Sequence, residues 1–243
     1  MGIEKCNAVV LRFADYKEAD RMLTLFSREE GKLSAAIKGV KKQKSKLRSG
    51  AELFALGEYV FNDKAGRLTV TGYTSLDTFY PIREDLERLW CATLAVNAVE
   101  TVATVQPEPE LFDSLVFSLS QLAYNDSVTS VAIINCFFMR LLDNSGIYPV
   151  MQACSCNGEK LYYNRAKSGF ACKDCATNGY IALESKSIDV LNHTDWDNNR
   201  LLLELNSLEA SQQKKIFKIL TDHASFCLDK RFKAVTFLES IML

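Results

Sequence analysis

Residues 21–39 have the sequence RMLTLFSREEGKLSAAIKG, and this stretch decides the class of fold. Over residues 21–27 polar and apolar side chains alternate, which is the two-residue period of a β-strand with one buried face. Glu30-Gly31 is a turn signal, and the strand pattern resumes over residues 32–39. The stretch therefore predicts a β-hairpin.

Strand patterns continue on both sides of this hairpin. Residues 7–13 form an apolar strand pattern, and residues 53–62 and 68–76 predict a second hairpin around the turn at 63–66. Five short, evenly spaced strands within about 75 residues are typical of a small β-barrel. An OB-fold fits this strand count, and an SH3-like barrel fits it nearly as well.

From residue 81 the apolar spacing becomes helical. Helices are expected over residues 85–105, 110–124, 128–146, 185–191, 211–228 and 232–242. Residues 131–139 are apolar on all sides, which predicts a central, buried helix.

The sequence thus predicts an α+β protein, in which an N-terminal OB-fold β-barrel precedes an α-helical domain with an inserted four-cysteine, zinc-ribbon-like module. The expected boundaries are 1–80 for the barrel, 81–150 and 182–243 for the two parts of the helical domain, and 151–181 for the module.

The bulk composition is that of a globular protein. Of 243 residues, 48% are hydrophobic and 24% are charged. No apolar run reaches the roughly 18 residues that span a bilayer, and the N-terminus has no signal-peptide pattern. We therefore expect a soluble, cytoplasmic protein that binds no membrane.

The net charge of −1 conceals an asymmetry along the chain. Residues 1–80 contain 14 Lys and Arg against 10 Asp and Glu, so the remainder is acidic. Six basic residues and no acidic one lie within Lys38–Arg48, here named the basic segment. Between two hairpins, such a segment predicts a solvated, mobile loop.

Lysines on such a loop can neutralise phosphates without recognising a base sequence. The alternative interpretation is a flexible surface loop that binds nothing. Four strand aromatics, Tyr16, Phe26, Tyr59 and Phe61, could offer stacking surfaces to bases, although aromatic residues in strands more often belong to the core.

Eight cysteines fall into two sets. Four are scattered among apolar residues, and four are clustered as Cys154, Cys156, Cys172 and Cys175. Two cysteine pairs separated by 15 residues match the plan of a structural Zn²⁺ site with four thiolate ligands. The first pair, Cys-x-Cys, is tighter than the usual Cys-x-x-Cys. Four reduced cysteines without metal remain an alternative.

Catalytic motifs are scarce. The sequence has two histidines, His193 and His223, and His223 is expected in the core. No glycine-rich phosphate loop occurs. Asp15, Glu18 and Asp20 could recruit a metal, which leaves a metal-dependent nuclease as one alternative, but the interleaved basic residues favour a turn. A scaffold that binds only proteins is another alternative.

Three stretches carry a resemblance to a known family. Residues 11–26 (LRFADYKEADRMLTLF), residues 30–42 (EGKLSAAIKGVKK) and residues 140–149 (RLLDNSGIYP) resemble the bacterial recombination mediator RecO. The order of barrel, helices, four-cysteine insertion and terminal helices extends this resemblance over nearly the whole chain.

The resemblance implies a function in DNA repair without enzymatic activity. It implies binding of single- and double-stranded DNA, annealing of complementary strands, and help in loading RecA onto strands coated by single-strand-binding protein, as in the RecFOR-type pathway. The implied partners are RecR and the acidic C-terminal tail of single-strand-binding protein, and the implied location is the nucleoid.

The resemblance also implies a structural Zn²⁺ and a set of DNA contacts. Basic positions that match the family are Arg12, Arg21, Lys38, Lys41 and Lys42. Charge alone adds Lys44, Lys46 and Arg48. The Cys154-Ser155-Cys156 pair is one residue shorter than the family's usual pair.

Overall fold

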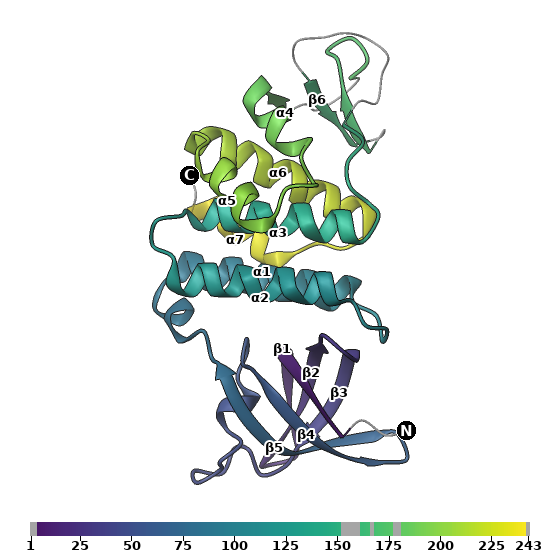
Figure 1. Ribbon diagram of the computed structural model, residues 1–243, viewed down its shortest axis with the longest axis vertical. Helices are drawn as coiled ribbons and strands as arrows, with labels where there is room; N and C mark the ends of the chain where they lie inside the picture. The colour runs from purple at the N-terminus through teal and green to yellow at the C-terminus, as the bar shows by residue number, and fades with distance from the viewer. Residues whose placement is uncertain (1–3, 152–160, 166–167, 177–180, 242–243) are drawn as a thin grey trace. The chain divides into compact units, whose positions relative to one another are not determined.

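A computed structural model of the protein describes residues 4–151, 161–165, 168–176 and 181–241 (Figure 1). The chain divides into two compact units, Met1–Ala123 and Tyr124–Leu243, and each is considered by itself. No helix within the described ranges combines the length and the apolar character that crossing a membrane requires.

The first unit begins with a closed five-stranded barrel, whose strands run from purple to blue in Figure 1. The strands are β1 (Lys5–Tyr16), β2 (Asp20–Ser27), β3 (Gly31–Ile37), β4 (Leu56–Lys64) and β5 (Arg67–Asp77). Their order around the barrel is β1-β2-β3-β5-β4, and β4 pairs with β1 to close it. The β3–β5 pair is parallel and the others are antiparallel. This arrangement is an OB-fold, which confirms the predicted fold class for this part of the chain.

Both predicted hairpins are present. The first pairs Arg21 with Ile37 and Ser27 with Gly31. At that turn Gly31 has a φ of 66°, and a Cβ there would lie 2.2 Å from the carbonyl oxygen of Gln106. A residue with a side chain would therefore clash with the chain that follows the first long helix.

Two helices complete the first unit. A 3₁₀ helix, η2 (Tyr80–Glu84), leads into α1 (Leu86–Val102), and α2 (Pro109–Tyr124) follows. The Asp85 carboxylate caps α1 by accepting a hydrogen bond from the Arg88 amide at 2.8 Å. Lys32 of β3 donates to the Glu100 carbonyl, and Arg28 forms a bidentate ion pair with Asp113. These bonds tie both helices to the barrel.

The second unit is built around one buried helix. Its helices are α3 (Ser130–Asn144), α4 (Ser185–Leu191), α5 (Asn198–Asn206), α6 (Ala210–Cys227) and α7 (Lys233–Ile241). A small sheet of order β7-β6-β8 comprises β6 (Leu161–Asn164), β7 (Gly169–Ala171) and β8 (Ala182–Leu183). Helix α3 packs against α5 and α6, and residues 132–139 are all buried, so the prediction of a central helix is confirmed.

Helix α5 and strand β8 were missed by the sequence analysis. The signals for α5 were present: Asp197 caps its first turn, and Leu201, Leu202 and Leu205 line its buried face. With nine residues, the helix is too short for its periodicity to stand out.

Arg140, which lies in the stretch that resembles the family, has a structural role. Its guanidinium donates to the Asn198 side chain and to the carbonyl oxygens of Thr194 and Trp196. These bonds fix the loop between α4 and α5 on the buried helix.

His223 is 1% exposed and joins three elements of the second unit. Its Nε2 lies 2.7 Å from the Ile147 carbonyl oxygen, so Nε2 donates and Nδ1 accepts from the Tyr163 hydroxyl at 2.9 Å. The expectation that His223 lies in the core is confirmed. Burial lowers the pKa of His223, because desolvation disfavours the imidazolium.

We predict that His223 makes stability depend on pH. Because its folded-state pKa is lowered, its contribution is complete above the ordinary histidine pKa near 6.5 and is lost as the pH falls below it. Urea unfolding at pH 7.5 and pH 5.5 measures the difference. His223→Gln is expected to reduce this pH dependence.

His193→Gln is the matched control. His193 has 44% of its side chain exposed and takes no part in the buried contacts of His223, so its replacement is expected to preserve the pH dependence. A wild-type protein that is equally stable at both pH values would contradict the prediction.

Candidate nucleic-acid interface

The basic segment is anchored where it leaves β3. The Gly39 amide donates to the Asp20 carboxylate at 2.8 Å, and the Lys41 amide donates to the Ala19 carbonyl at 3.1 Å. Val40, between these two anchors, is 2% exposed and belongs to the barrel core. The first turn of the segment is therefore fixed to the turn between β1 and β2.

The chain is anchored again just after the basic segment. The buried Tyr59 hydroxyl donates to the Gly50 carbonyl at 2.9 Å, and Arg21 donates to the Ala51 carbonyl at 2.9 Å. A Cβ on Gly50 would lie 2.5 Å from the Tyr73 ring, so only glycine allows this approach. Leu47 also packs against the barrel core.

Between its anchors the segment forms successive turns. The Lys42 amide donates to the Gly39 carbonyl, and the Ser45 amide donates to the Lys42 carbonyl. The prediction of a solvated surface is confirmed for the lysines, while the backbone beneath them forms hydrogen-bonded turns. Two apolar residues of the segment, Val40 and Leu47, pack on the barrel core and hold it there.

Most cations of the segment point to solvent. Five are exposed, and in the described part of the chain their side chains have no hydrogen-bond or ion-pair partner: Lys38, Lys42, Lys44, Lys46 and Arg48. Because the backbone beneath them is already fixed, binding an anion costs less conformational entropy than on a flexible loop.

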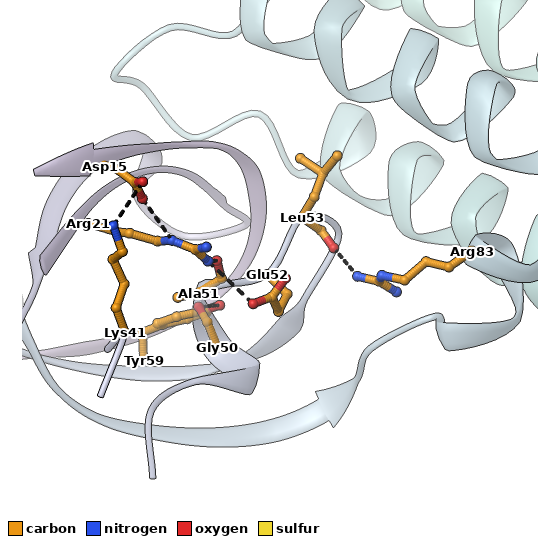
Figure 2. Close-up of polar contacts among 9 residues, drawn as sticks. All are labelled: Asp15, Arg21, Lys41, Gly50, Ala51, Glu52, Leu53, Tyr59 and Arg83. Atoms are coloured by element: carbon orange, nitrogen blue, oxygen red, sulfur yellow. Dashed lines mark hydrogen bonds and ion pairs between the residues drawn. The ribbon is translucent and has the colours of Figure 1, made fainter. Parts of the chain in front are cut away.

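The other predicted DNA contacts take part in internal ion pairs. Figure 2 shows Asp15 between Lys41 and Arg21, at 3.0 and 3.4 Å. The Lys41 ammonium, and after it Arg21, hold the pKa of the Asp15 carboxyl below its ordinary value. Arg12 instead pairs with Glu100 of α1 at 3.4 Å.

Arg21 is the most enclosed of these cations, with 19% of its side chain exposed. Besides Asp15 and the Ala51 carbonyl, its guanidinium contacts Glu52 at 3.3 Å and stacks on the Phe13 ring at 4.1 Å. This geometry gives Arg21 a structural task, which is to hold the chain just beyond the basic segment.

Three of the four candidate stacking aromatics are buried. Phe26 and Tyr59 are fully buried and Phe61 is 7% exposed, so none of them offers its face to a base. Tyr16 alone of this set is substantially exposed, at 47%. The alternative that strand aromatics form the core is correct for the other three.

The carboxylates Asp15, Glu18 and Asp20 form no metal site. Residues 17–19 form the turn that the sequence favoured, and Asp15 and Asp20 are engaged with Lys41 and with the Gly39 amide. No group of three potential metal ligands occurs among the described residues.

Comparison with protein families agrees with this architecture. The family model for the N-terminal part of recombination protein O matches residues 1–79, and the model for its C-terminal part matches residues 83–234. The chain belongs to the RecO family. The resemblance inferred from three short stretches is thereby confirmed across both units.

Individual members of the RecO family are similar over most of their length. The DNA repair protein RecO of Acetivibrio thermocellus is 28% identical over 253 aligned positions, covering 99% of this chain and 98% of the relative. The protein of the same name from Desulfitobacterium hafniense is 34% identical over 187 positions, covering 74% and 67%.

The cysteine cluster of this RecO-family chain is described in part. Cys154 and Cys156 lie outside the described residues. Cys172 follows β7 and is 7% exposed. Its carbonyl accepts hydrogen bonds from the amides of Cys175 and Ala176 at 3.2 and 2.9 Å, so Cys172–Cys175 is a tight turn.

Arg83 was not singled out from the sequence. Its guanidinium donates to the carbonyl oxygens of Thr78 and Leu53, the second of which is drawn in Figure 2. It thus joins η2 to the chain that follows the basic segment. A lone arginine near a helix start carries no sequence signal for such a contact.

We predict that Arg21→Met destabilises the protein. The variant removes the donor to the carbonyl oxygen of the buried Ala51, which costs about 1–3 kcal/mol. Urea unfolding measures this loss.

Arg12→Met is the matched control, since its single exposed ion pair is worth less than about 1 kcal/mol. If the two variants were equally stable, the structural task assigned to Arg21 would be refuted.

Proposed function

We propose that this chain acts in DNA repair and recombination by binding the backbones of DNA strands, without catalysing a reaction. The proposal rests on membership of the RecO family and on one observation. Five exposed cations of the basic segment stand on a fixed backbone with no side-chain partner among the described residues. Lys41 and Arg12, both partly exposed, can add to this surface.

Backbone binding accounts for action on both single- and double-stranded DNA. Lysines neutralise phosphates and release counterions whatever the base sequence. The Watson–Crick edges of a strand held in this way remain available for pairing. Cations between two strands also reduce their mutual repulsion, so we further propose that the chain anneals complementary strands.

The remaining steps of the proposal come from the family. We propose that the chain assists RecA loading onto strands coated by single-strand-binding protein, and that it contacts RecR and the C-terminal tail of single-strand-binding protein. These partners place it at the nucleoid. The engagement of Asp15 and Asp20 within the barrel argues against the nuclease alternative.

We predict that replacing Lys38, Lys42, Lys44 and Lys46 with Ala weakens DNA binding and flattens its salt dependence. Each lost phosphate contact should reduce the log–log slope of affinity against salt by about 0.9 for duplex and about 0.7 for single strands. Fluorescence anisotropy over a salt titration measures this slope. Annealing of bare and protein-coated complementary strands should slow in parallel.

The matched control replaces Lys64, Lys214, Lys218 and Lys233, which are exposed and lie outside the basic segment, and so makes the same change in net charge. A slope that falls equally in both variants would remove the segment from the interface. A wild-type protein with no DNA affinity would favour the protein-binding scaffold, and strand cleavage with Mg²⁺ would favour the nuclease.

We also propose that Cys154, Cys156, Cys172 and Cys175 hold a structural Zn²⁺. The turn at Cys172–Cys175 suits a pair of thiolate ligands, because its backbone hydrogen bonds keep both cysteines at one tight bend. The bound ion would crosslink this turn to the first cysteine pair. With four protein ligands, it would have no open position for chemistry.

We predict about one Zn²⁺ per chain in purified protein, lost in Cys172→Ser and measured by mass spectrometry of metals. The exposed Cys227 provides the control, since Cys227→Ser should retain the metal. Metal-free protein that is as stable as the metal-loaded form would overturn this assignment.

A further inference from the structure

A cavity of about 630 Å³ opens beside the end of the basic segment, within the first unit. Lys46 and Arg48 line it from the segment, and Tyr80 and Arg83 line it from η2. Its volume falls within the range of sites that hold a small organic group. The sequence analysis did not identify it, because its two walls are more than 30 residues apart.

Tyr80 gives this cavity an aromatic wall. Tyr80 is 61% exposed, whereas the preceding Phe79 is 1% exposed. Phe79 has a left-handed backbone with φ of 47°, and its amide donates to the Asp77 carboxylate at 2.8 Å. This turn buries Phe79 and leaves the next residue, Tyr80, exposed.

Hydrogen bonds hold Arg83, one of the lining residues, in place. Arg83 binds the carbonyl oxygens of Thr78 and Leu53, and its guanidinium lies over the Phe54 ring at 5.6 Å. Phe54 is also buried in a left-handed conformation, with φ of 69°. Two buried phenylalanines in this costly backbone region persist only where the surrounding structure holds them, which is common at binding sites.

The charge of the lining favours an anion. Lys46 and Arg48 are exposed, and no side-chain partner for them occurs among the described residues. Glu52 is the only acidic residue in the lining, and its carboxylate accepts from Arg21 at 3.3 Å. An aromatic ring beside two unpaired cations is the combination that binds a base and its phosphate.

We propose that this cavity holds one unpaired nucleotide of a DNA strand, with its base stacked on Tyr80 and its flanking phosphates at Lys46 and Arg48. The proposal rests on the proposed function and deepens it. The interior of a duplex cannot use the site, because both faces of each base there are already stacked on neighbours. A strand is favoured over a free nucleotide because Lys42 and Lys44, which precede Lys46 in the same segment, are exposed cations that can take further phosphates.

The test compares Tyr80→Ala with wild type on three ligands of equal length: a single strand, a duplex, and a strand of tetrahydrofuran abasic residues that keeps every phosphate. Loss of one base–aromatic stack should weaken binding of the normal strand by about 5- to 150-fold. Binding of the duplex and of the abasic strand should not change. Tyr80→Phe should bind like wild type.

Tyr124→Ala is the matched control, since Tyr124 is 56% exposed and does not line the cavity. A second variant, Tyr80→Trp, gives a direct readout, because its added fluorescence should be quenched by the normal strand and not by the abasic strand. Thermal unfolding of each variant verifies folding.

Several outcomes would overturn the proposal. Tyr80→Ala could bind the normal strand as tightly as wild type does, or it could lose the same affinity for all three ligands. Free thymidine monophosphate could also compete as well as a strand does. In each case the lysine variant of the basic segment still reports on backbone binding. Only a wild-type protein that binds no DNA would remove the proposed function as well.

Discussion

Closure of the barrel is the constraint on which the first unit depends. Strand β5 lies parallel to β3, while β4 lies between β5 and β1, so the chain must cross one end of the barrel after Ile37 before β4 begins at Leu56. The basic segment lies within this crossing. Its apolar members Val40 and Leu47 pack on the core, as do Ala51 and Ala55 beyond it. Because Val40 and Leu47 turn toward the barrel core, the lysines beside them face solvent.

This arrangement divides the cations into two groups with different tasks. Arg21 and Lys41 neutralise Asp15 and hold the crossing in place, whereas the cations farther along have no internal partner among the described residues. The charges of the first group are compensated within the protein, whereas those of the second group face solvent. In the proposed function, such a surface would bind phosphates at a lower entropic cost than a segment whose backbone must first become ordered.

In the second unit, too, hydrogen bonds of partly or fully buried side chains hold loops and strands in place. Arg140 fixes the loop before α5, and His223 joins β6 to α6 and to the chain after α3. Arginine and histidine are common in binding and catalytic sites, so residue type alone would suggest such a role for both. Their acceptors are backbone carbonyls and neighbouring side chains, which makes them part of the framework that carries the small sheet and the Cys172–Cys175 turn.

The sequence by itself determined the barrel, most helices and the charge of the basic segment. Strand alternation, helical spacing and local charge are patterns of residues close together in the sequence, so they can be recognised without knowing how the rest of the chain folds. Only the tertiary structure decided which cations are available, because Glu52 and Glu100, which pair with Arg21 and Arg12, lie 31 and 88 residues away. It also decided that Phe26, Tyr59 and Phe61 are core while Tyr80 lines a cavity. A local pattern indicates which face of a strand or helix is buried, but the packing of distant segments decides whether a given aromatic ring is covered.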